Sequence, residues 1–237
     1  MFVRDLMSAP AVTITPDANF QDALQTMRKH NFRRLPVVDK KGRLAGIVSE
    51  RDLLHAAPSP ASSLSVWELN YLLSRLTVQQ VMTRAIIITT PDTPIEHAAS
   101  LMVANKVGGL PVVDNHDRVV GVITETDIFT AFVNMLDGED GGVRLTLEVP
   151  DGHGIPFTLV QSLAGLGAEL VSLGVFGRVN GRQRMLMVLK GVTLRQLQEH
   201  LHLEDVLVTS AMETPEPAIP YTMPLRAHAT TYNGARL

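Results

Sequence analysis

The chain has 237 residues, of which 45% are hydrophobic and 19% are charged, and its formal net charge is −3. This length accommodates two or three small domains, and the weakly acidic balance gives no global electrostatic support for nucleic-acid binding. The absence of cysteine excludes disulfides, thiolate catalysis and cysteine-based metal sites. Arg4 and Asp5 interrupt the amino terminus, and no apolar run approaches the roughly 18 residues of a membrane-spanning helix. We therefore expect a cytoplasmic protein.

The first predicted unit covers residues 1–57 and alternates short strands with helices. β-Branched alternation predicts strands, a 3.6-residue apolar period predicts helices, and turn residues separate them. The expected elements are a strand at 11–15, a helix capped by Asp17, strands at 35–38 and 44–48, and a helix from Ser49 to the residue before Pro58.

The unit is repeated at residues 78–135. Leu35-Pro36-Val37-Val38-Asp39 recurs as Leu110-Pro111-Val112-Val113-Asp114, and Gly46 to Asp52 recurs as Gly121 to Asp127, at one offset of 75 residues. Each internal repeat is one structural unit, and so small a unit buries too little surface to be stable alone. We therefore predict a pseudo-symmetric pair of repeats.

The segment 58–77 is predicted to link the repeats. Its first part is a loop rich in Pro, Ser and Ala, and Ser65 and Glu68 then have the spacing of a helix capping box. Trp67 and Tyr71 on this helix are interpreted as packing residues rather than ligand contacts.

A second kind of domain is predicted after the acidic, Gly-rich linker at 137–142. The patterns at 142–210 give the order βαββαβ, which predicts an antiparallel sheet with helices on one face, and the whole chain is classed as α+β. The expected elements are strands at 143–149, 169–177, 184–189 and 206–208, helices at 155–166 and 194–201, and an Asn180-Gly181 hairpin turn. The proline-rich segment 211–237 is predicted to be an extended or disordered tail.

The candidate chemistry lies in Ser49-x-x-Asp52 and its copy Thr124-x-x-Asp127. One interpretation is a helix cap, with a hydroxyl at the N-cap and a carboxylate one turn later. The other is a ligand site, because a helix N-terminus with a hydroxyl suits phosphate and a nearby carboxylate can accept hydrogen bonds from ribose hydroxyls. Recurrence of the pattern after a Gly-led strand favours a ribose phosphate.

These residues resemble the cystathionine-β-synthase (CBS) domain, which occurs as a tandem pair called a Bateman module. The resemblance covers about residues 1–135 and implies two CBS repeats of βαββα that bind an adenosine ligand between them: AMP, ADP, ATP or S-adenosylmethionine. It implies that Ser49 and Thr124 contact phosphate, Asp52 and Asp127 hold the ribose, and Ile47 and Val122 line the base pocket.

The resemblance also implies an asymmetry between the two clefts. Arg33-Arg34 precede the first Leu-Pro-Val-Val-Asp strand, where Gly108-Gly109 precede the second. In a pseudo-twofold pair the arginines face Thr124 and Asp127, which makes that cleft the stronger phosphate site. The alternative is that both arginines are simply solvated.

The segment 142–210 resembles an ACT domain, a ferredoxin-like amino-acid-sensing fold that pairs its sheets across dimers. Asp151-x-x-Gly154 matches the family's first-loop pattern, so Asp151 and Gly154 are candidate ligand contacts, although a turn without ligand has the same pattern. A CBS pair followed by an ACT-like domain resembles the acetoin-utilisation protein B type.

The expected function is a non-catalytic sensor that binds adenine nucleotide as a regulatory ligand, forms a homodimer and acts allosterically on an unknown partner protein. No catalytic motif, prosthetic group or metal-ligand spacing is found in the sequence, and no membrane association is expected. The alternatives are an enzyme acting on a nucleotide, a CBS pair serving as a ligand-free dimerisation scaffold, and a nucleic-acid-binding regulator. The last would use the basic cluster Arg28, Lys29, His30, Arg33, Arg34, Lys40, Lys41 and Arg43.

Overall fold

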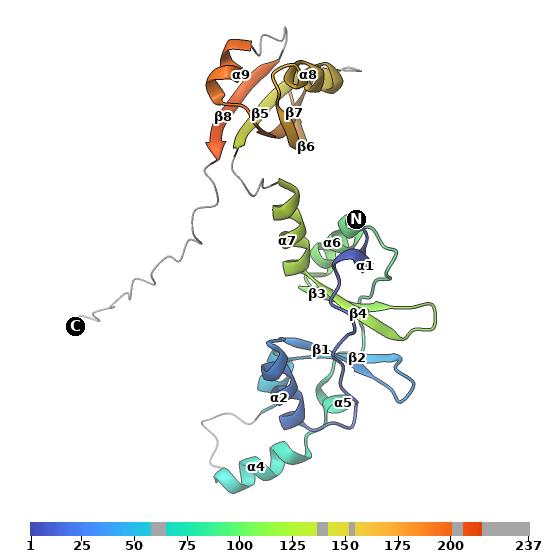
Figure 1. The fold of residues 1–237 in the computed structure, drawn as a ribbon. Helices are drawn as coiled ribbons and strands as arrows, with labels where there is room; N and C mark the ends of the chain where they lie inside the picture. The colour runs from blue at the N-terminus through green and yellow to red at the C-terminus, as the bar shows by residue number, and fades with distance from the viewer. Residues whose placement is uncertain (58–64, 137–141, 152–154, 201–205, 215–237) are drawn as a thin grey trace, which may run out of the picture. The chain divides into compact units, whose positions relative to one another are not determined.

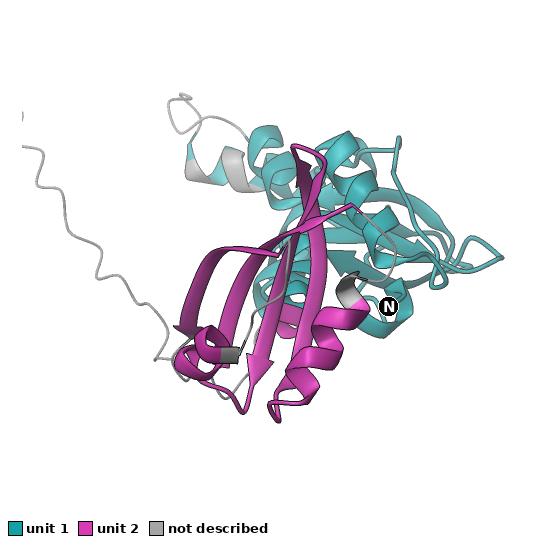
Figure 2. Cartoon of the chain, turned by 90° about the horizontal axis from the view of Figure 1, so that it is seen from above, with its two compact units in different colours: residues 1–132 teal, residues 133–237 magenta. Residues whose placement is uncertain are grey.

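A computed structural model describes residues 1–57, 65–136, 142–151, 155–200 and 206–214. The chain forms two compact units, unit 1 from Met1 to Phe132 and unit 2 from Val133 to Leu237 (Figure 2). The predicted linker segments 58–64 and 137–141, and the tail beyond Thr214, lie outside the described residues. No helix in the described part of the chain is long and apolar enough to cross a membrane.

Unit 1 contains the two predicted repeats, and each has a two-stranded antiparallel hairpin followed by a helix (Figure 1). The hairpins have the same register, since Leu35 pairs with Val48 in one and Leu110 pairs with Ile123 in the other. Repeat 1 contains α2 (Phe20–His30), β1 (Arg34–Val38), β2 (Leu44–Ser49) and α3 (Glu50–Ala56). Repeat 2 contains α6 (Ile95–Asn105), β3 (Gly109–Val113), β4 (Val119–Thr124) and α7 (Glu125–Leu136). Hairpins and helices therefore confirm the repeat.

Two local predictions in repeat 1 are wrong. The segment 11–15 contains only one isolated bridge, in which Ile14 pairs in parallel with Val37. The N-cap of α2 is Asn19, whose side chain accepts a 2.8 Å hydrogen bond from the Asp22 amide. Asp17 lies in the preceding turn, where a hydrogen bond from the Thr15 side chain lowers the pKa of its carboxyl. Both acceptors suit a cap, and the position of the turn selects Asn19.

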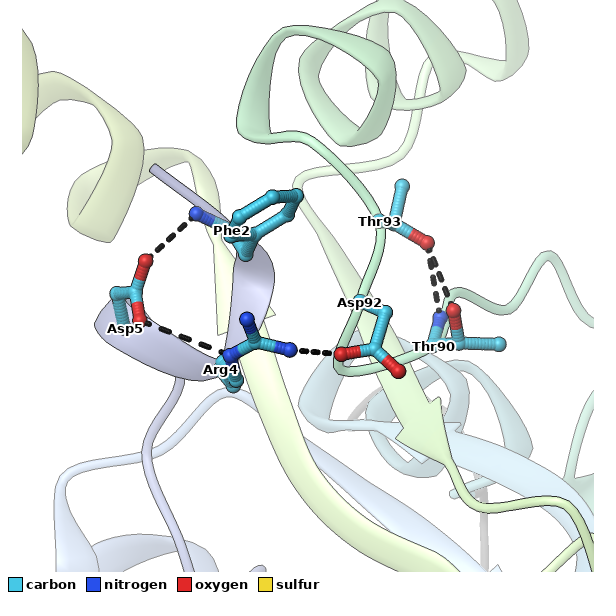
Figure 3. A network of polar contacts seen from close by, with 6 residues as sticks. All are labelled: Phe2, Arg4, Asp5, Thr90, Asp92 and Thr93. Carbon is cyan, nitrogen blue, oxygen red and sulfur yellow. Dashed lines mark hydrogen bonds and ion pairs between the residues drawn. The ribbon is translucent and has the colours of Figure 1, made fainter.

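The amino-terminal residues pack in repeat 2 rather than in repeat 1. The short helix α1 (Val3–Leu6) docks on the turn before α6, where Val3 N–H donates to Thr93 O at 2.9 Å. Arg4 pairs with Asp92 of the same turn, and Phe2 N–H donates to Asp5 at 2.7 Å (Figure 3). Val3 is fully buried in the core of repeat 2.

The counterpart helix α5 (Val78–Val81) makes the reciprocal contact with repeat 1. Val78 N–H donates to Ala18 O at 2.9 Å, and Val78 is fully buried in the core of repeat 1. Beyond each short helix the chain pairs with a hairpin, since Ser8 bridges Val122 and Thr83 bridges Ile47. The repeats therefore exchange their first segments, which the linear boundaries 1–57 and 78–135 do not show.

The two hairpin turns have the same internal bonding and meet each other. In repeat 1, Asp39 Oδ1 accepts from the amides of Lys41 and Arg43 at 2.8 and 2.9 Å, and Asp114 Oδ1 does the same for His116 and Arg118 at 2.9 Å each. Leu44 N–H then donates to Asp117 O, and Val119 N–H donates to Gly42 O, each at 3.1 Å. These bonds join the two turns directly.

The Asp114 turn predicts a specific acid sensitivity. The Arg118 amide, the Arg118 guanidinium and the His116 amide lower the pKa of Asp114 from 3.8 to about 2. A depressed folded pKa gives stability that is present above the unfolded value and is lost as pH falls from about 4 towards 2. In acid titrations followed by circular dichroism, Asp114→Asn should therefore lose less stability between pH 4 and pH 2 than the wild type. Parallel profiles would contradict this assignment.

Helix α4 (Val66–Arg75) links the repeats and begins with the predicted capping box, in which Ser65 Oγ and Glu68 exchange hydrogen bonds. Its Leu73 packs against the core of repeat 1. Trp67 and Tyr71, by contrast, are 85% and 60% exposed in the single chain, so their expected packing role is not found there. They lie on the part of the helix that is turned away from that core.

Unit 2 is a four-stranded antiparallel sheet with the order β6-β7-β5-β8. Alternate residues of β5, including Leu145 and Leu147, are buried against Leu159 of α8 and Leu197 of α9, so both helices cover one face. The elements are β5 (Gly142–Pro150), α8 (Ile155–Ala164), β6 (Glu169–Val179), β7 (Arg182–Lys190), α9 (Leu194–His200) and β8 (Leu207–Thr214). This is the predicted βαββαβ order.

Of two further predictions for unit 2, one is confirmed and one is wrong. The Asn180-Gly181 turn is confirmed, with φ of 50° and 73°, the positive values that a two-residue hairpin turn requires. The prediction that the tail starts at residue 211 is wrong, because β8 continues to Thr214 and pairs with β5 from Leu207 opposite Glu148 to Thr214 opposite Gly142, with one register shift at Thr146/Leu147. Pairing with a neighbouring strand overrides the weak local pattern.

Candidate functional site in the CBS pair

Both Ser/Thr-x-x-Asp motifs form capping boxes at the starts of α3 and α7. Ser49 N–H and Oγ–H donate to Asp52 Oδ2 at 2.9 and 2.6 Å, and the Asp52 amide donates back to Ser49 Oγ at 3.2 Å. Thr124 and Asp127 repeat this pattern at 2.7, 2.7 and 3.4 Å. The capping interpretation is therefore confirmed for both copies.

Each cap occupies only one of the two oxygens of the aspartate carboxylate. In each box both donors reach the same oxygen, Oδ2, so Oδ1 takes no part in the cap. Asp52 and Asp127 are half-buried, and neither residue is closed off from solvent. A carboxylate oxygen in this state can still accept hydrogen bonds from vicinal hydroxyls of a sugar.

A cavity of about 180 Å³ lies beside the first capping box, between the repeats. Ser49 and Asp52 supply its oxygen groups and Arg34 a guanidinium, and repeat 2 contributes Gly109. The remaining walls are mainly apolar and consist of Ile47, Thr83, Ala85, Ile86, Ile87, Val107 and Pro111. The cavity therefore combines an anion, a cation and an apolar surface.

Arg34 is placed differently from the expectation. The sequence put it opposite Thr124 and Asp127, but it lines the cavity of Ser49 and Asp52. The β1–β2 register explains this, because Arg34 pairs directly with Ser49 across the hairpin. Its Nη1 lies 3.2 Å from the position that a Cβ on Gly108 would occupy, and Glu125 Oε2 lies 3.1 Å from the same position, so the Arg34 side chain reaches repeat 2 at the start of α7.

The other predicted residues of the CBS pair are distributed as follows. Ile47 lines the cavity, and Val122 holds the equivalent place in repeat 2, where its backbone pairs with Ser8 as that of Ile47 pairs with Thr83. Arg33 is exposed, and its carbonyl accepts from Glu50 N–H, in the first turn of α3, at 3.0 Å. Thr124 and Asp127 have the same local geometry as Ser49 and Asp52 at the start of α7.

The predicted basic cluster is divided between opposite ends of repeat 1. Arg33 and Arg34 stand at the start of β1, whereas Lys41 and Arg43 lie at the turn beyond its other end. Arg43 is moreover paired with Asp39 at 2.8 Å. The cluster therefore does not form the single continuous patch that a nucleic-acid surface requires.

The segment 83–87 is the part of the cavity that sequence reasoning missed. Thr83 is held against the hairpin by two backbone hydrogen bonds with Ile47, of 3.0 and 2.9 Å, and Ile86 and Ile87 continue the wall. The sequence did contain a clue to this segment, because Thr83 and Ser8 are equivalent at the offset of 75 residues and both carry a hydroxyl. The clue could not be assigned to a cleft, because the sequence does not show that the first segments of the two repeats are exchanged.

In unit 2, Asp151 is tied to the β6–β7 hairpin. Its Oδ1 accepts from Gln183 Nε2 at 2.7 Å and lies 3.5 Å from Arg178 Nη2. Gly154, the other candidate contact, lies outside the described residues. Within the described ranges, no three His, Asp or Glu side chains lie close enough together to hold a metal ion.

The CBS domain model matches this chain twice, at residues 3–59 and 78–134. A CBS domain-containing protein of Dictyostelium discoideum is 33% identical over 137 residues, which cover 58% of this chain and 94% of that protein. The chain belongs to the CBS domain family. The matched residues include both capping boxes and both Leu-Pro-Val-Val-Asp strands.

Other relatives match a similar share of this CBS-domain chain. An L-aspartate semialdehyde sulfurtransferase of Methanocaldococcus jannaschii is 32% identical over 130 residues, or 55% of this chain, but the match spans only 23% of that enzyme. A solved structure from Vibrio cholerae, described as an acetoin utilization protein (AcuB), is 32% identical to this chain. The match covers 57% of this chain and 93% of that one, with a TM-score of 0.49. A CBS domain pair solved with 5′-methylthioadenosine and S-adenosyl-L-methionine is 32% identical, with 56% and 95% covered and a TM-score of 0.47.

Proposed function

We propose that this protein is a non-catalytic regulator whose CBS pair senses an adenine nucleotide or S-adenosylmethionine. The observation that carries the proposal is the cavity between the repeats in which Asp52, Ser49 and Arg34 meet an apolar wall. The principal site is placed here rather than at Thr124 and Asp127, because the guanidinium of Arg34 lines this cavity. The second capping box is proposed as the second nucleotide site.

The proposed pose assigns each part of the ligand to a matching surface. The base lies against Ile47 and Pro111, and the ribose hydroxyls donate to Asp52 Oδ1, which the cap leaves unused. The phosphate lies near Ser49 and the exposed Arg34, whose planar guanidinium suits a phosphate group. Common ligand pockets have volumes of roughly 300–1,000 Å³, whereas this cavity holds about 180 Å³, so the proposed pose requires the cavity to widen when the ligand binds.

The test is thermal and chemical unfolding of the whole chain with AMP, ADP, ATP and S-adenosylmethionine, for the wild type and Asp52→Asn. A ligand at about 100 times its dissociation constant adds about 2.7 kcal/mol to the unfolding free energy. Asp52→Asn keeps an oxygen acceptor for the cap but removes the charge that strengthens bonds from ribose hydroxyls. We expect ligand affinity to fall about tenfold to a hundredfold, because charge-assisted hydrogen bonds are about twice as strong as neutral ones.

The matched control is Asp127→Asn, which makes the same change in the equivalent capping box. Both variants should lose a similar amount of stability without ligand, and the larger loss of ligand response should belong to Asp52→Asn. No ligand-dependent stabilisation of the wild type would favour the ligand-free scaffold instead. Turnover of bound ATP, lost in Asp52→Asn, would favour the enzyme alternative.

The domain organisation completes the proposal. Residues 1–135 act as the CBS sensor and 142–214 as an ACT-like domain that binds an amino acid or small metabolite; the antiparallel sheet order β6-β7-β5-β8 supports the fold of that domain. Homodimerisation is proposed because twofold pairing is the commonest symmetry, and exposed Phe129 and Phe132 on α7 offer apolar surface. Ligand binding regulates a partner only if it binds two states of the protein with different affinity.

A further inference from the structure

An open hollow of about 270 Å³ lies where the two hairpin turns of unit 1 meet. It is lined by Lys41, Arg43, His116 and Arg118. Repeat 1 supplies two of these basic side chains and repeat 2 the other two. Arg43 and Arg118 form a direct backbone bridge, and flanking hydrogen bonds of 3.1 Å fix the turns on each other. Four groups that carry or can carry positive charge are thus held together across the interface of the repeats.

The arginines are held in place and are not fully occupied. Arg43 gives Nε and Nη2 to Asp39 Oδ2 at 2.9 and 2.8 Å, and Arg118 gives the same two atoms to Asp114 Oδ2 at 2.8 and 2.7 Å. In each pair the Nη1 group takes no part. Each guanidinium is therefore oriented by its own carboxylate, while two N–H donors remain for another acceptor.

We propose that this hollow binds a small, multiply charged oxyanion of the phosphate or pyrophosphate class. Such a ligand accepts from Nη1 of both arginines and from Lys41 and His116, and so bridges the repeats. A multiply charged anion is favoured because two carboxylates already offset two of the four cations, and the donors approach from both turns. The site is separate from the cavity beside Ser49 and Asp52, with which it shares no lining residue.

The experiment measures binding of inorganic pyrophosphate and of inorganic phosphate to the full chain by isothermal titration calorimetry at about 0.15 M ionic strength, where the Debye length is about 8 Å. The test variant is Lys41→Ala plus His116→Ala, which leaves both Asp–Arg pairs intact. The charge-matched control is Lys29→Ala plus His97→Ala, which removes an exposed lysine and an exposed histidine elsewhere in unit 1. We expect the test variant to bind pyrophosphate at least about tenfold more weakly than the wild type and the control to change little, since exposed distant charges are screened.

A second arm separates this hollow from the nucleotide cavity as the source of binding. Arg33→Ala plus Arg34→Ala removes two cations beside the nucleotide cavity, so the pyrophosphate binding that depends on Lys41 and His116 should remain in this variant. Saturable binding that is lost in this variant and retained in the Lys41/His116 variant would overturn the proposal. Equal weakening in the test and control variants, or no saturable binding to the wild type, would overturn it as well.

Discussion

Val3→Asp is expected to lower the unfolding free energy of unit 1 by about 4 kcal/mol or more, the cost of burying a charge without a partner. Val3 is fully buried among residues of repeat 2, although it lies more than 90 residues before that repeat's α6. Urea unfolding measures the loss. Val103→Asp is the control, because Val103 is 80% exposed on α6 and the same change there should cost about 0.5 kcal/mol or less.

Two smaller substitutions, Val3→Ala and Val78→Ala, show which repeat of unit 1 each valine stabilises. Val3→Ala and Val78→Ala each remove two buried methyl groups, worth about 2 kcal/mol. Because the first segments are exchanged, Val3→Ala should reduce hydrogen-exchange protection at Leu110 and Ile123 first, and Val78→Ala at Leu35 and Val48 first. Early loss of protection in repeat 1 on Val3→Ala would show that α1 packs on its own repeat.

Gly46→Val is expected to destabilise unit 1 by about 2–3 kcal/mol. A Cβ at Gly46 would lie 2.4 Å from Met82 Sδ and 3.2 Å from the Thr83 carbonyl oxygen, so the exchanged segment leaves no room for a branched side chain. Valine favours a strand over glycine by up to about 1 kcal/mol, and overpacking exceeds that gain. Denaturant unfolding gives the size of the net loss.

Two comparisons isolate the steric cause of the Gly46 effect. Gly174→Val, in β6, places its Cβ where no atom lies within 4 Å and should be neutral or slightly stabilising. In a Met82→Ala background Gly46→Val should cost clearly less than in the wild type, because the flexible side chain it meets has been removed. Equal costs in both backgrounds would show that Met82 is not what excludes the valine.

The sequence by itself determined the repeat and its hairpins, and it offered the capping boxes as one of two interpretations. These features depend on residues close together in the chain: Ser49 and Asp52 are one helical turn apart, and the Asp39 turn bonds within five residues. The offset of 75 residues showed the second copy without any contact between the copies. In unit 2, alternation and the Asn180-Gly181 turn predicted the βαββαβ order for the same local reason.

Only the tertiary structure decided which repeat each first segment joins and which cleft Arg34 lines. A buried valine has the same pattern in either core, so Val3 and Val78 could not be assigned from periodicity. Likewise, Lys41 and His116 are ordinary turn residues until backbone bonds between the repeats bring them to one hollow. Local pattern fixes elements, but the partner of an element is fixed by the packing of segments far apart in the chain, where a second copy offers an equally apolar core.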